Sequence, residues 1–141
     1  MTQPPRAILA VDPGRDKCGV AVVSPAGEPL EQAVIPAHAL AERAAELAQR
    51  YTIDVIVVGD RTGADAAVEA LELALPQIET APVNEHRSTE EARRLYFRDH
   101  PPRGWRRLIP VTMQVPPRPY DDYVAVILAR RHLRGGGEQA G

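Results

Sequence analysis

Residues 6–23 read RAILAVDPGRDKCGVAVV, two short apolar runs separated by a turn. The first run ends at Asp12 and is followed by Pro-Gly, a pair that ends strands and forms turns. The second run, 18–23, is apolar throughout, which is typical of a buried strand. Because the connection between the runs is short, we expect them to pair as a hairpin. This hairpin would begin the fold and leave Asp12 at the carboxyl end of its first strand.

Downstream of the hairpin, strand patterns alternate with helical ones. Residues 28–35 predict a weaker strand, which we place at a sheet edge because it contains Pro29. Residues 53–58, IDVIVV, are almost all β-branched and predict a central strand. Ser88 and Glu91 fit a capping box that opens a helix. In chain order, the expected strands are 6–12, 18–23, 28–35, 53–58 and 81–84, and the expected helices are 38–51, 62–75, 88–98 and 120–133.

Three strands followed by alternating helices and strands predict an α/β fold, with a five-stranded mixed sheet and helices on both faces. The chain has 141 residues, of which 44% are hydrophobic and 26% charged, so we expect a single domain over 1–141. Its ends, 1–5 and 135–141, are expected to be flexible. Residues 99–119 hold six prolines and predict a long loop with an extended stretch at 108–115.

The composition excludes several classes of protein. No apolar run approaches the roughly 18 residues of a membrane span, and we expect no signal peptide. The single Cys18 cannot form an internal disulfide, which fits a cytoplasmic protein. The net charge of −2 is unevenly distributed, because 1–80 carry 6 basic and 12 acidic residues while 81–141 carry 11 arginines and 7 acidic residues. Since Arg binds phosphate with a planar fork, the mean charge does not exclude a nucleic-acid partner.

Carboxylates lie at the ends of three separate elements. Asp12 and Glu85 lie at the carboxyl ends of the first and fifth expected strands, and Asp121 and Asp122 lie in the first turn of the last helix. Ligands of α/β sheets bind outside the carboxyl ends of strands, so these acids could surround one point. Crowded carboxylates repel unless cations neutralise them, and oxygen ligands suit Mg²⁺ or Mn²⁺. Two such ions about 4 Å apart can activate a water and stabilise the leaving oxygen of a phosphodiester.

Each acid also has a purely structural explanation. Asp12 in VDPG fits the first position of a β-turn. Glu85 fits a solvated loop, and Asp121 and Asp122 fit charges that complement a helix macrodipole. The spacing of the residues alone therefore leaves a metal site and a set of ordinary turn and cap residues both open.

Four segments together resemble the YqgF/RuvX family, whose fold is RNase H-like. ILAVDPGRDKCGVAVV resembles the family's first hairpin, DVIVVG its central strand, VNEHRSTEEARRLYF its acidic segment and next helix, and YDDYVAVILARRHL its last helix. The resemblance implies a metal-dependent nuclease with two Mg²⁺ or Mn²⁺ ions. Its role would be 5′-end processing of pre-16S ribosomal RNA or resolution of Holliday junctions. Asp12, Glu85 and Asp121 match the family's catalytic, metal-binding acids, and Asp122 would be a further ligand or a helix cap.

The chain departs from the family pattern at positions that bear on the substrate. The neighbours of Glu85 are Asn and His where the family has Asp and Arg, so Arg87 is the candidate phosphate-binding residue there. The loop after the central strand reads GDRTGADAA and makes Asp60 a candidate extra ligand. In the turn after the first strand, Arg15 and Lys17 are candidates to meet a phosphate.

The long loop places arginines around an aromatic residue. Arg103, Arg106 and Arg107 surround Trp105, a combination that can hold phosphates and stack an unpaired base. Packing in the core explains Trp105 equally well. The expected partners are structured or single-stranded RNA and branched or single-stranded DNA, with no membrane. Junction resolution would in addition need two active sites, and hence a homodimer.

Other functions remain to be weighed against a nuclease. A catalytically weak nucleic-acid-binding module of the same fold would keep the basic loop and lose metal-dependent turnover. The three acids that match the family speak against this alternative. An actin-like or sugar-kinase-like ATPase also binds phosphate at a first hairpin, but it needs two such domains, for which 141 residues are too few. A dinucleotide-binding domain is weaker still, because G-x-G-x-x-G is absent.

Overall fold

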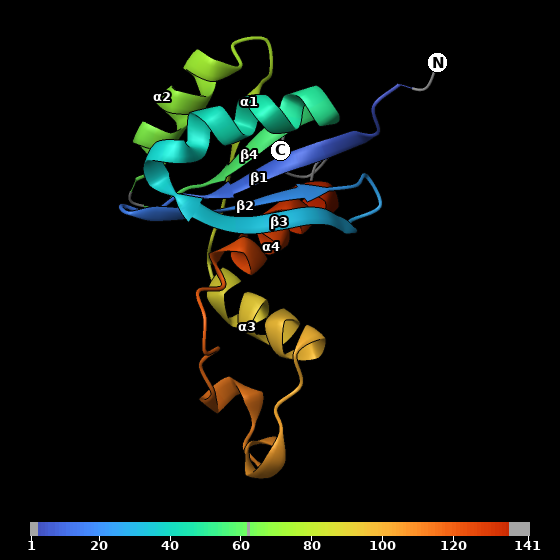
Figure 1. Cartoon of the computed structure of the whole chain (residues 1–141), viewed down its shortest axis with the longest axis vertical. Coiled ribbons are helices and arrows are strands. Elements are labelled where there is room, and N and C mark those ends of the chain that lie inside the picture. Colours follow the sequence, from blue (N-terminus) through green and yellow to red (C-terminus); the bar gives the residue numbers. More distant parts are fainter. Residues whose placement is uncertain (1–2, 62, 136–141) are drawn as a thin grey trace.

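Five strands pair in the part of the chain that the computed structural model describes, residues 3–61 and 63–135. They are β1 (Arg6–Asp12), β2 (Lys17–Val23), β3 (Pro29–Pro36), β4 (Thr52–Gly59) and β5 (Thr80–Val83). Their order across the sheet is β3-β2-β1-β4-β5 (Figure 1). β2 runs antiparallel to β1 and β3, whereas β1, β4 and β5 run parallel to one another. The mixed five-stranded sheet predicted from the sequence is therefore confirmed.

The opening hairpin forms as expected from β1 and β2, with Asp12 opposite Gly19 at the end of the ladder. β3 lies at the sheet edge, in agreement with the position of Pro29 in the sequence. β4 has a neighbour on each side, although the middle strand of the sheet is β1. Because β1, β4 and β5 are parallel, all three end on the same side of the sheet, which we call the carboxyl edge.

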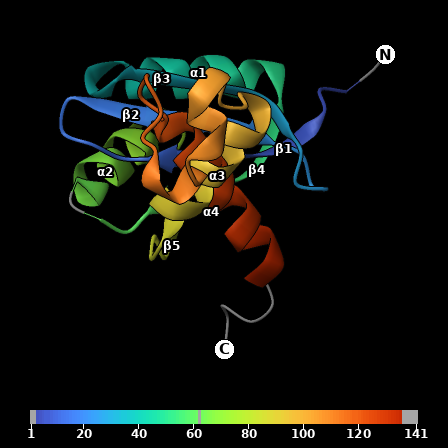
Figure 2. The same cartoon turned by 90° about the horizontal axis from the view of Figure 1, so that it is seen from below.

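Helices cover both faces of the sheet, as predicted. Figure 1 shows α1 (Leu40–Arg50) and α2 (Ala64–Ala74) on one face. On the other face lies α4 (Asp121–Gly135), and α3 (Ser88–Asp99) packs against α4 on the side away from the sheet. Figure 2, seen from below, shows α3 and α4 in front of the strands, and α4 contacts every strand. Three short 3₁₀ helices complete the described elements: η1 (Ala37–Ala39), η2 (Gly104–Leu108) and η3 (Val111–Met113).

The core consists of two apolar layers, one on each face of the sheet. In β1, Leu9 and Val11 pack into the layer under α1 and α2, while Ile8 and Ala10 pack into the layer against α4. The strand is therefore buried on both faces, which is why its sequence is continuously apolar instead of alternating. Burial of each such large aliphatic side chain stabilises the fold by about 1.5–3 kcal/mol. These two layers hold the carboxyl edge in place.

The predicted capping box at the start of α3 is wrong. The N-cap position is occupied by Arg87, whose φ of 59° lies in the left-handed region, and Ser88 is already the first helical residue. The Ser88 hydroxyl has no hydrogen-bond partner in the part of the chain that the structure describes, and the Glu91 carboxylate instead accepts a 2.7 Å hydrogen bond from Arg131. The reason is a tight turn in which the Ser88 backbone N–H donates to the Glu85 carbonyl at 2.9 Å.

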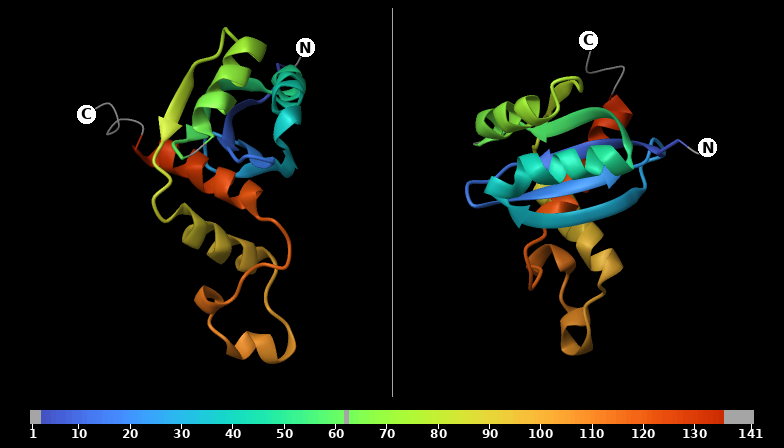
Figure 3. Two further views of the ribbon diagram at one scale, coloured as in Figure 1. Left: turned by 90° about the vertical axis from the view of Figure 1, so that its left-hand side faces the viewer. Right: turned by 45° about the horizontal axis from the view of Figure 1, so that its top comes forward.

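Residues 100–119, which we call the arm, project beyond α3 and away from the sheet (Figures 1 and 3). The extended stretch predicted at 108–115 is replaced by the end of η2 and by η3. The Gln114 amide stabilises this conformation, because it donates 2.8 Å hydrogen bonds to the carbonyls of Arg106 and Ile109. The arm is therefore held by local hydrogen bonds and by α3, from which Arg93 donates to the Thr112 carbonyl at 3.3 Å.

The predicted flexible ends are only partly within the described residues, since 1–2 and 136–141 lie outside them. The carbonyls of Pro4 and Pro5 accept hydrogen bonds from Thr52, which ties this part of the chain to β4. Gly135 is the last residue of α4. Among the helices of the described ranges, none combines the length and the hydrophobicity that crossing a bilayer requires.

Candidate active site

Asp12 and Glu85 meet at the carboxyl edge of the sheet. Asp12 is the last residue of β1, and Glu85 follows β5 with its side chain only 1% exposed. The Asp12 carboxyl group lies within hydrogen-bonding reach of the Glu85 side chain. Among the described residues, no N–H or hydroxyl group donates to the buried Oε1 atom of Glu85. Two ionised carboxylates repel at this range, so the pair needs either a shared proton or a cation beside it.

The electrostatics of Asp12 reflect this crowding. Burial, followed by the contact with Glu85 and the negative charge of Asp121, raises the pKa of Asp12 from 3.8 to about 8, and the positive charge of Arg61 opposes the rise. At neutral pH the metal-free pair therefore holds a proton. A divalent cation would replace that proton and give the orphaned Oε1 atom of Glu85 a partner. The donor chemistry of the pair thus fits Mg²⁺ or Mn²⁺.

The Glu85 side chain is positioned by the end of β4. Its Oε2 atom accepts a 2.9 Å hydrogen bond from the backbone N–H of Arg61. Its own backbone N–H donates to the Asp60 side chain at 3.3 Å. Gly59 leaves room for it, since a Cβ there would lie 2.7 Å from both Cγ and Oε1 of Glu85. The end of β4 and the start of the next loop therefore act as a cradle for one carboxylate.

Asp121 reaches the same region from α4. The first turn of α4 packs directly on β2 at Gly19, where a Cβ would lie 2.6 Å from the Asp122 backbone nitrogen and closer still to the Asp121 carbonyl. Asp121 is half-buried, and burial raises its pKa against the opposing charge of Lys17. Asp12 and Asp121 both line a hollow of about 240 Å³. The glycine in the hairpin thus lets the helix bring a third acid to the carboxyl edge.

The three acids are not equally close to one another. Within residues 3–61 and 63–135, no three His, Cys, Asp or Glu side chains are arranged to hold a metal ion together. The structure brings Asp12 and Glu85 into contact and places Asp121 on the wall of the adjoining hollow. Coordination by all three acids would therefore require a side chain of this set to change rotamer.

Asp122, expected as a further ligand or a cap, makes a separate set of contacts. Its side chain is 3% exposed and accepts a 2.9 Å hydrogen bond from the Gln32 amide. Its two carboxylate oxygens also accept hydrogen bonds of 3.4 Å from the two terminal nitrogens of Arg118. The Arg118 guanidinium in turn stacks over the rings of Tyr96 and Tyr123. This arrangement joins the end of the arm to α3 and α4.

Basic residues lie on both the rim of the hollow and the arm. Arg15 and Lys17 are exposed and line the hollow beside Asp12. Arg87 is exposed at the start of α3. Asp60, the candidate extra ligand, is also exposed and bonds to the Glu85 backbone instead of joining the carboxylate pair.

The aromatic residue of the arm is on the surface. Trp105 is 69% exposed, which excludes the explanation that it packs in the core. The guanidinium of Arg106 lies over its ring, 5.8 Å from the centroid. The neighbouring Arg103 and Arg107 are exposed as well. These four residues therefore form a basic and aromatic surface on the arm, separate from the rim of the hollow.

Sequence reasoning missed several residues that shape the site. Gly19 and Gly59 make room for the acids, and Arg61 and Arg118 each pair with a buried carboxylate. The glycine that ends the apolar run of β4, directly before Asp60, was an available signal for a close approach at that position. Glu85 lies 24 residues after Arg61, so the local sequence does not indicate that pair, whereas Arg118 stands only four residues before its partner Asp122.

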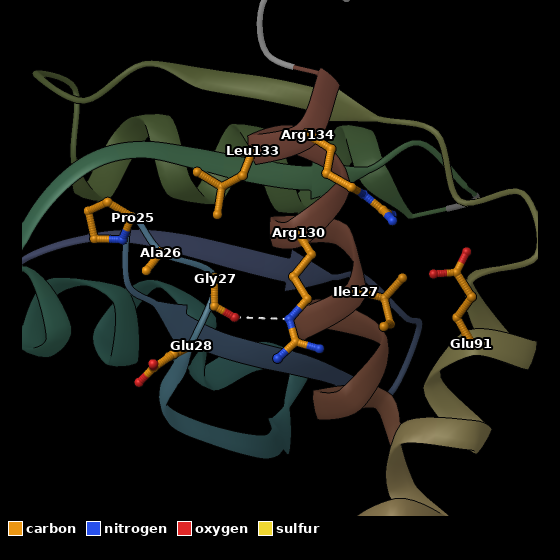
Figure 4. A pocket seen from close by; sticks show the side chains of 9 residues that line it. All are labelled: Pro25, Ala26, Gly27, Glu28, Glu91, Ile127, Arg130, Leu133 and Arg134. Atoms are coloured by element: carbon orange, nitrogen blue, oxygen red, sulfur yellow. Dashed lines mark hydrogen bonds between the residues drawn. The ribbon is translucent and has the colours of Figure 1, made fainter.

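A second cavity, of about 510 Å³, lies away from the carboxylates (Figure 4). It is formed by the turn between β2 and β3 and by the C-terminal half of α4. Arg130 donates from Nε to the Gly27 carbonyl at 2.9 Å across it, as the dashed line in Figure 4 marks. None of the candidate catalytic, metal-binding or substrate-binding residues lines this cavity, although Glu91 of the predicted capping box does.

Comparisons with known proteins show what this architecture resembles. No family model and no curated protein sequence matches the chain. Among solved structures, Thermus thermophilus RuvC in complex with a Holliday junction substrate aligns with a TM-score of 0.63 and 15% identity, over 94% of this chain and 96% of that one. A second Thermus thermophilus RuvC structure aligns with a TM-score of 0.61 and 16% identity, over 92% and 94% of the two chains. At such identities the likeness is one of architecture, and it shows that this chain has the RNase H-like fold of RuvC.

Proposed function

We propose that this chain is a metal-dependent nuclease that hydrolyses phosphodiester bonds of RNA or branched DNA. The observation that carries the proposal is the contact between Asp12 and the buried Glu85 at the carboxyl edge, where no N–H or hydroxyl group within residues 3–61 and 63–135 donates to one of the Glu85 carboxylate oxygens. Two carboxylates are costly to bury together unless a cation binds them. The nearby Asp121 and the shared fold with RuvC, whose complex holds a Holliday junction, support nucleic acid as the substrate.

Asp12, Glu85 and Asp121 would hold the metal, as two Mg²⁺ or Mn²⁺ ions. Bound there, divalent ions would stabilise the negative charge on the phosphodiester oxygens and lower the pKa of a bound water. The other residues of the site have roles that need no metal. Arg15 and Lys17 on the rim of the hollow would bind the flanking phosphates and orient the strand over the carboxylates.

The surface of the arm would extend this contact along the nucleic acid. The exposed Trp105 offers a face for an unpaired base, and the adjacent Arg103, Arg106 and Arg107 offer charges for phosphates. Arg87 would contribute a phosphate contact beside Glu85. Because the arm and the rim of the hollow are separate surfaces, a branched or folded substrate would contact both of them more fully than a short single strand would.

The finer proposals follow from the resemblance of four sequence segments to the YqgF/RuvX family. They are 5′-end processing of pre-16S ribosomal RNA or Holliday-junction resolution, in the cytoplasm. Resolution would require a homodimer, because two strands must be cut. The same resemblance makes Asp122 a further ligand, although its contacts with Gln32 and Arg118 favour a structural role.

A catalytically weak binding module of the same fold is the second candidate function. The observation that favours it is that no three potential ligands are gathered for a metal within the described ranges, 3–61 and 63–135. Such a module would use the rim and the arm and bind nucleic acid without cutting it.

Cleavage assays with the wild-type chain and Asp12→Asn would test the proposal. The substrates are a four-way DNA junction, single-stranded DNA and single-stranded RNA, each with Mn²⁺, Mg²⁺ or EDTA. We expect cleavage by the wild type with metal only, and none by the variant. Equal cleavage by both proteins would contradict the catalytic assignment. Binding of the substrates without cleavage in either metal would favour the binding module.

A further inference from the structure

Arg61 contacts Glu85 through both its backbone and its side chain. Its N–H donates to Glu85 Oε2 at 2.9 Å, and its guanidinium donates to the Glu85 carbonyl at 3.3 Å. The guanidinium Nε also lies 3.8 Å from Oε2, so the two side chains form an ion pair. Arg61 is in addition the positive charge that opposes the raised pKa of Asp12. Arg61 therefore supplies a cation beside the carboxylate pair.

The two partners of this ion pair differ in their freedom to move. The Glu85 side chain is 1% exposed and fixed between Gly59 and the Arg61 backbone, whereas the Arg61 side chain is 53% exposed. The exposed guanidinium can leave Glu85 and be hydrated by solvent, so its departure requires no rearrangement of the backbone. Glu85 would keep its position, because the backbone hydrogen bond to Oε2 does not depend on the arginine side chain.

A guanidinium and a divalent cation cannot both occupy this place without repulsion. A metal ion bound by Glu85 and Asp12 would lie close to the Arg61 charge, and like charges at such range repel strongly in a partly buried site. We propose that Arg61 is the resident counter-cation of this site, which neutralises Glu85 in the metal-free protein and is displaced when a divalent ion binds. The inference rests on the proposed function, because it assumes that Glu85 receives a metal ion.

The consequence is that Arg61 weakens metal binding while it stabilises the metal-free fold. Arg61→Gln removes the charge but keeps the backbone N–H that orients Glu85. Without the guanidinium, the buried carboxylate loses its counter-charge, so the metal-free protein should unfold at a lower temperature. The metal no longer has to displace a cation, so its affinity should rise.

The experiment measures thermal unfolding of the full chain in EDTA and across a Mn²⁺ titration, without nucleic acid. For Arg61→Gln we expect a melting temperature lower by about 3–5 °C in EDTA, and Mn²⁺ affinity raised roughly three- to tenfold. At saturating Mn²⁺ the two proteins should melt at similar temperatures. Arg61→Lys, which keeps a positive charge, should restore most of the wild-type behaviour.

Arg15→Gln is the matched control, because Arg15 lines the hollow and the structure gives it no ion pair with either acid. It removes the same charge from the rim and should leave the melting temperature in EDTA unchanged. Weaker or unchanged Mn²⁺ binding by Arg61→Gln, or an equal gain in Arg15→Gln, would overturn the role of Arg61 alone. Failure of the wild type to bind Mn²⁺ would overturn this inference and the proposed metal dependence together.

Discussion

Gly59 at the end of β4 provides the space that the Glu85 side chain occupies, and a Cβ on Gly59 would lie 2.7 Å from both Cγ and Oε1 of Glu85. Real Cβ atoms do not approach heavy atoms this closely, so any other residue at position 59 must displace the carboxylate. The burial of Glu85 and its contact with Asp12 both depend on this absence of a side chain. A glycine in a neighbouring strand is thus part of the candidate active site.

Gly59→Ala should therefore damage the site through Glu85. We expect a loss of about 1–3 kcal/mol in the free energy of unfolding, because the core around Glu85 has no room for the methyl group. Mn²⁺ should no longer stabilise the variant. Urea unfolding with and without Mn²⁺ measures both effects.

A double-mutant cycle tests whether the clash is with Glu85 itself. In the Glu85→Ala background the space is free, so Gly59→Ala should cost much less than it does in the wild type. The same cost in both backgrounds would show that position 59 acts through other contacts.

The raised pKa of Asp12 predicts an unusual dependence of stability on pH. Its pKa is 3.8 when unperturbed and about 8 in the folded, metal-free protein. Between these values the folded state binds more protons than the unfolded state, so stability should fall as the pH rises from about 4 to about 8. Asp12→Asn should flatten this dependence. Urea unfolding in EDTA over that range measures it, and parallel curves for the two proteins would contradict the assignment.

Asp121 and Asp122 are adjacent in the sequence and should respond differently to the same change. Asp122→Asn breaks its ion pair with Arg118, so we expect a cost of about 1–3 kcal/mol in stability. The stabilisation by Mn²⁺ should persist in that variant. Asp121→Asn should leave stability nearly unchanged and reduce the effect of Mn²⁺. The opposite pattern, read from melting temperatures with and without Mn²⁺, would make Asp122 the ligand.

The surface of the arm should contribute to nucleic-acid binding and little to stability. Trp105→Ala and Arg106→Gln change exposed side chains, so we expect stability to stay within about 0.5 kcal/mol of the wild type. Arg106→Gln removes one phosphate contact, so it should lower the slope of log affinity against log salt by about 1. Anisotropy of a labelled junction across a salt series measures this.

Arg43→Gln on α1 is the control for the arm, because it removes a surface arginine from the opposite face of the sheet. It should leave the salt slope unchanged. Trp105 is the sole tryptophan of the chain, so its intrinsic fluorescence reports directly on the arm. No change in that fluorescence on binding would argue against a contact at the arm.

The strands and helices themselves were predictable, because each is encoded by a local pattern. The continuous apolar runs of β1 and β4 reflect strands buried on both faces, and the order of elements is compatible with few sheet topologies. The meeting of Asp12 and Glu85 also followed from a general rule, since parallel strands end at one edge. The sequence was sufficient for these two acids because the direction of each strand alone determines at which edge of the sheet its last residue lies.

The contacts that distinguish similar residues were decided only by the tertiary structure. Which of Asp121 and Asp122 faces the hollow depends on how the first turn of α4 seats on Gly19, more than a hundred positions earlier in the chain. The capping box failed for a similar reason, since a turn back to the Glu85 carbonyl made Arg87 the N-cap.

The sequence by itself thus determined the α/β order of elements and the placement of acids at strand and helix ends. The tertiary structure decided which acids pair, that Arg61 and Arg118 are their counter-charges, and that Trp105 lies on the surface. The physical reason is that hydrophobic periodicity records whether a residue is buried but not what it is buried against. Glu85 finds Arg61 from 24 residues away and Asp122 finds Gln32 from 90 residues away, so packing alone brings these partners together, whereas Arg118 stands only four residues before Asp122.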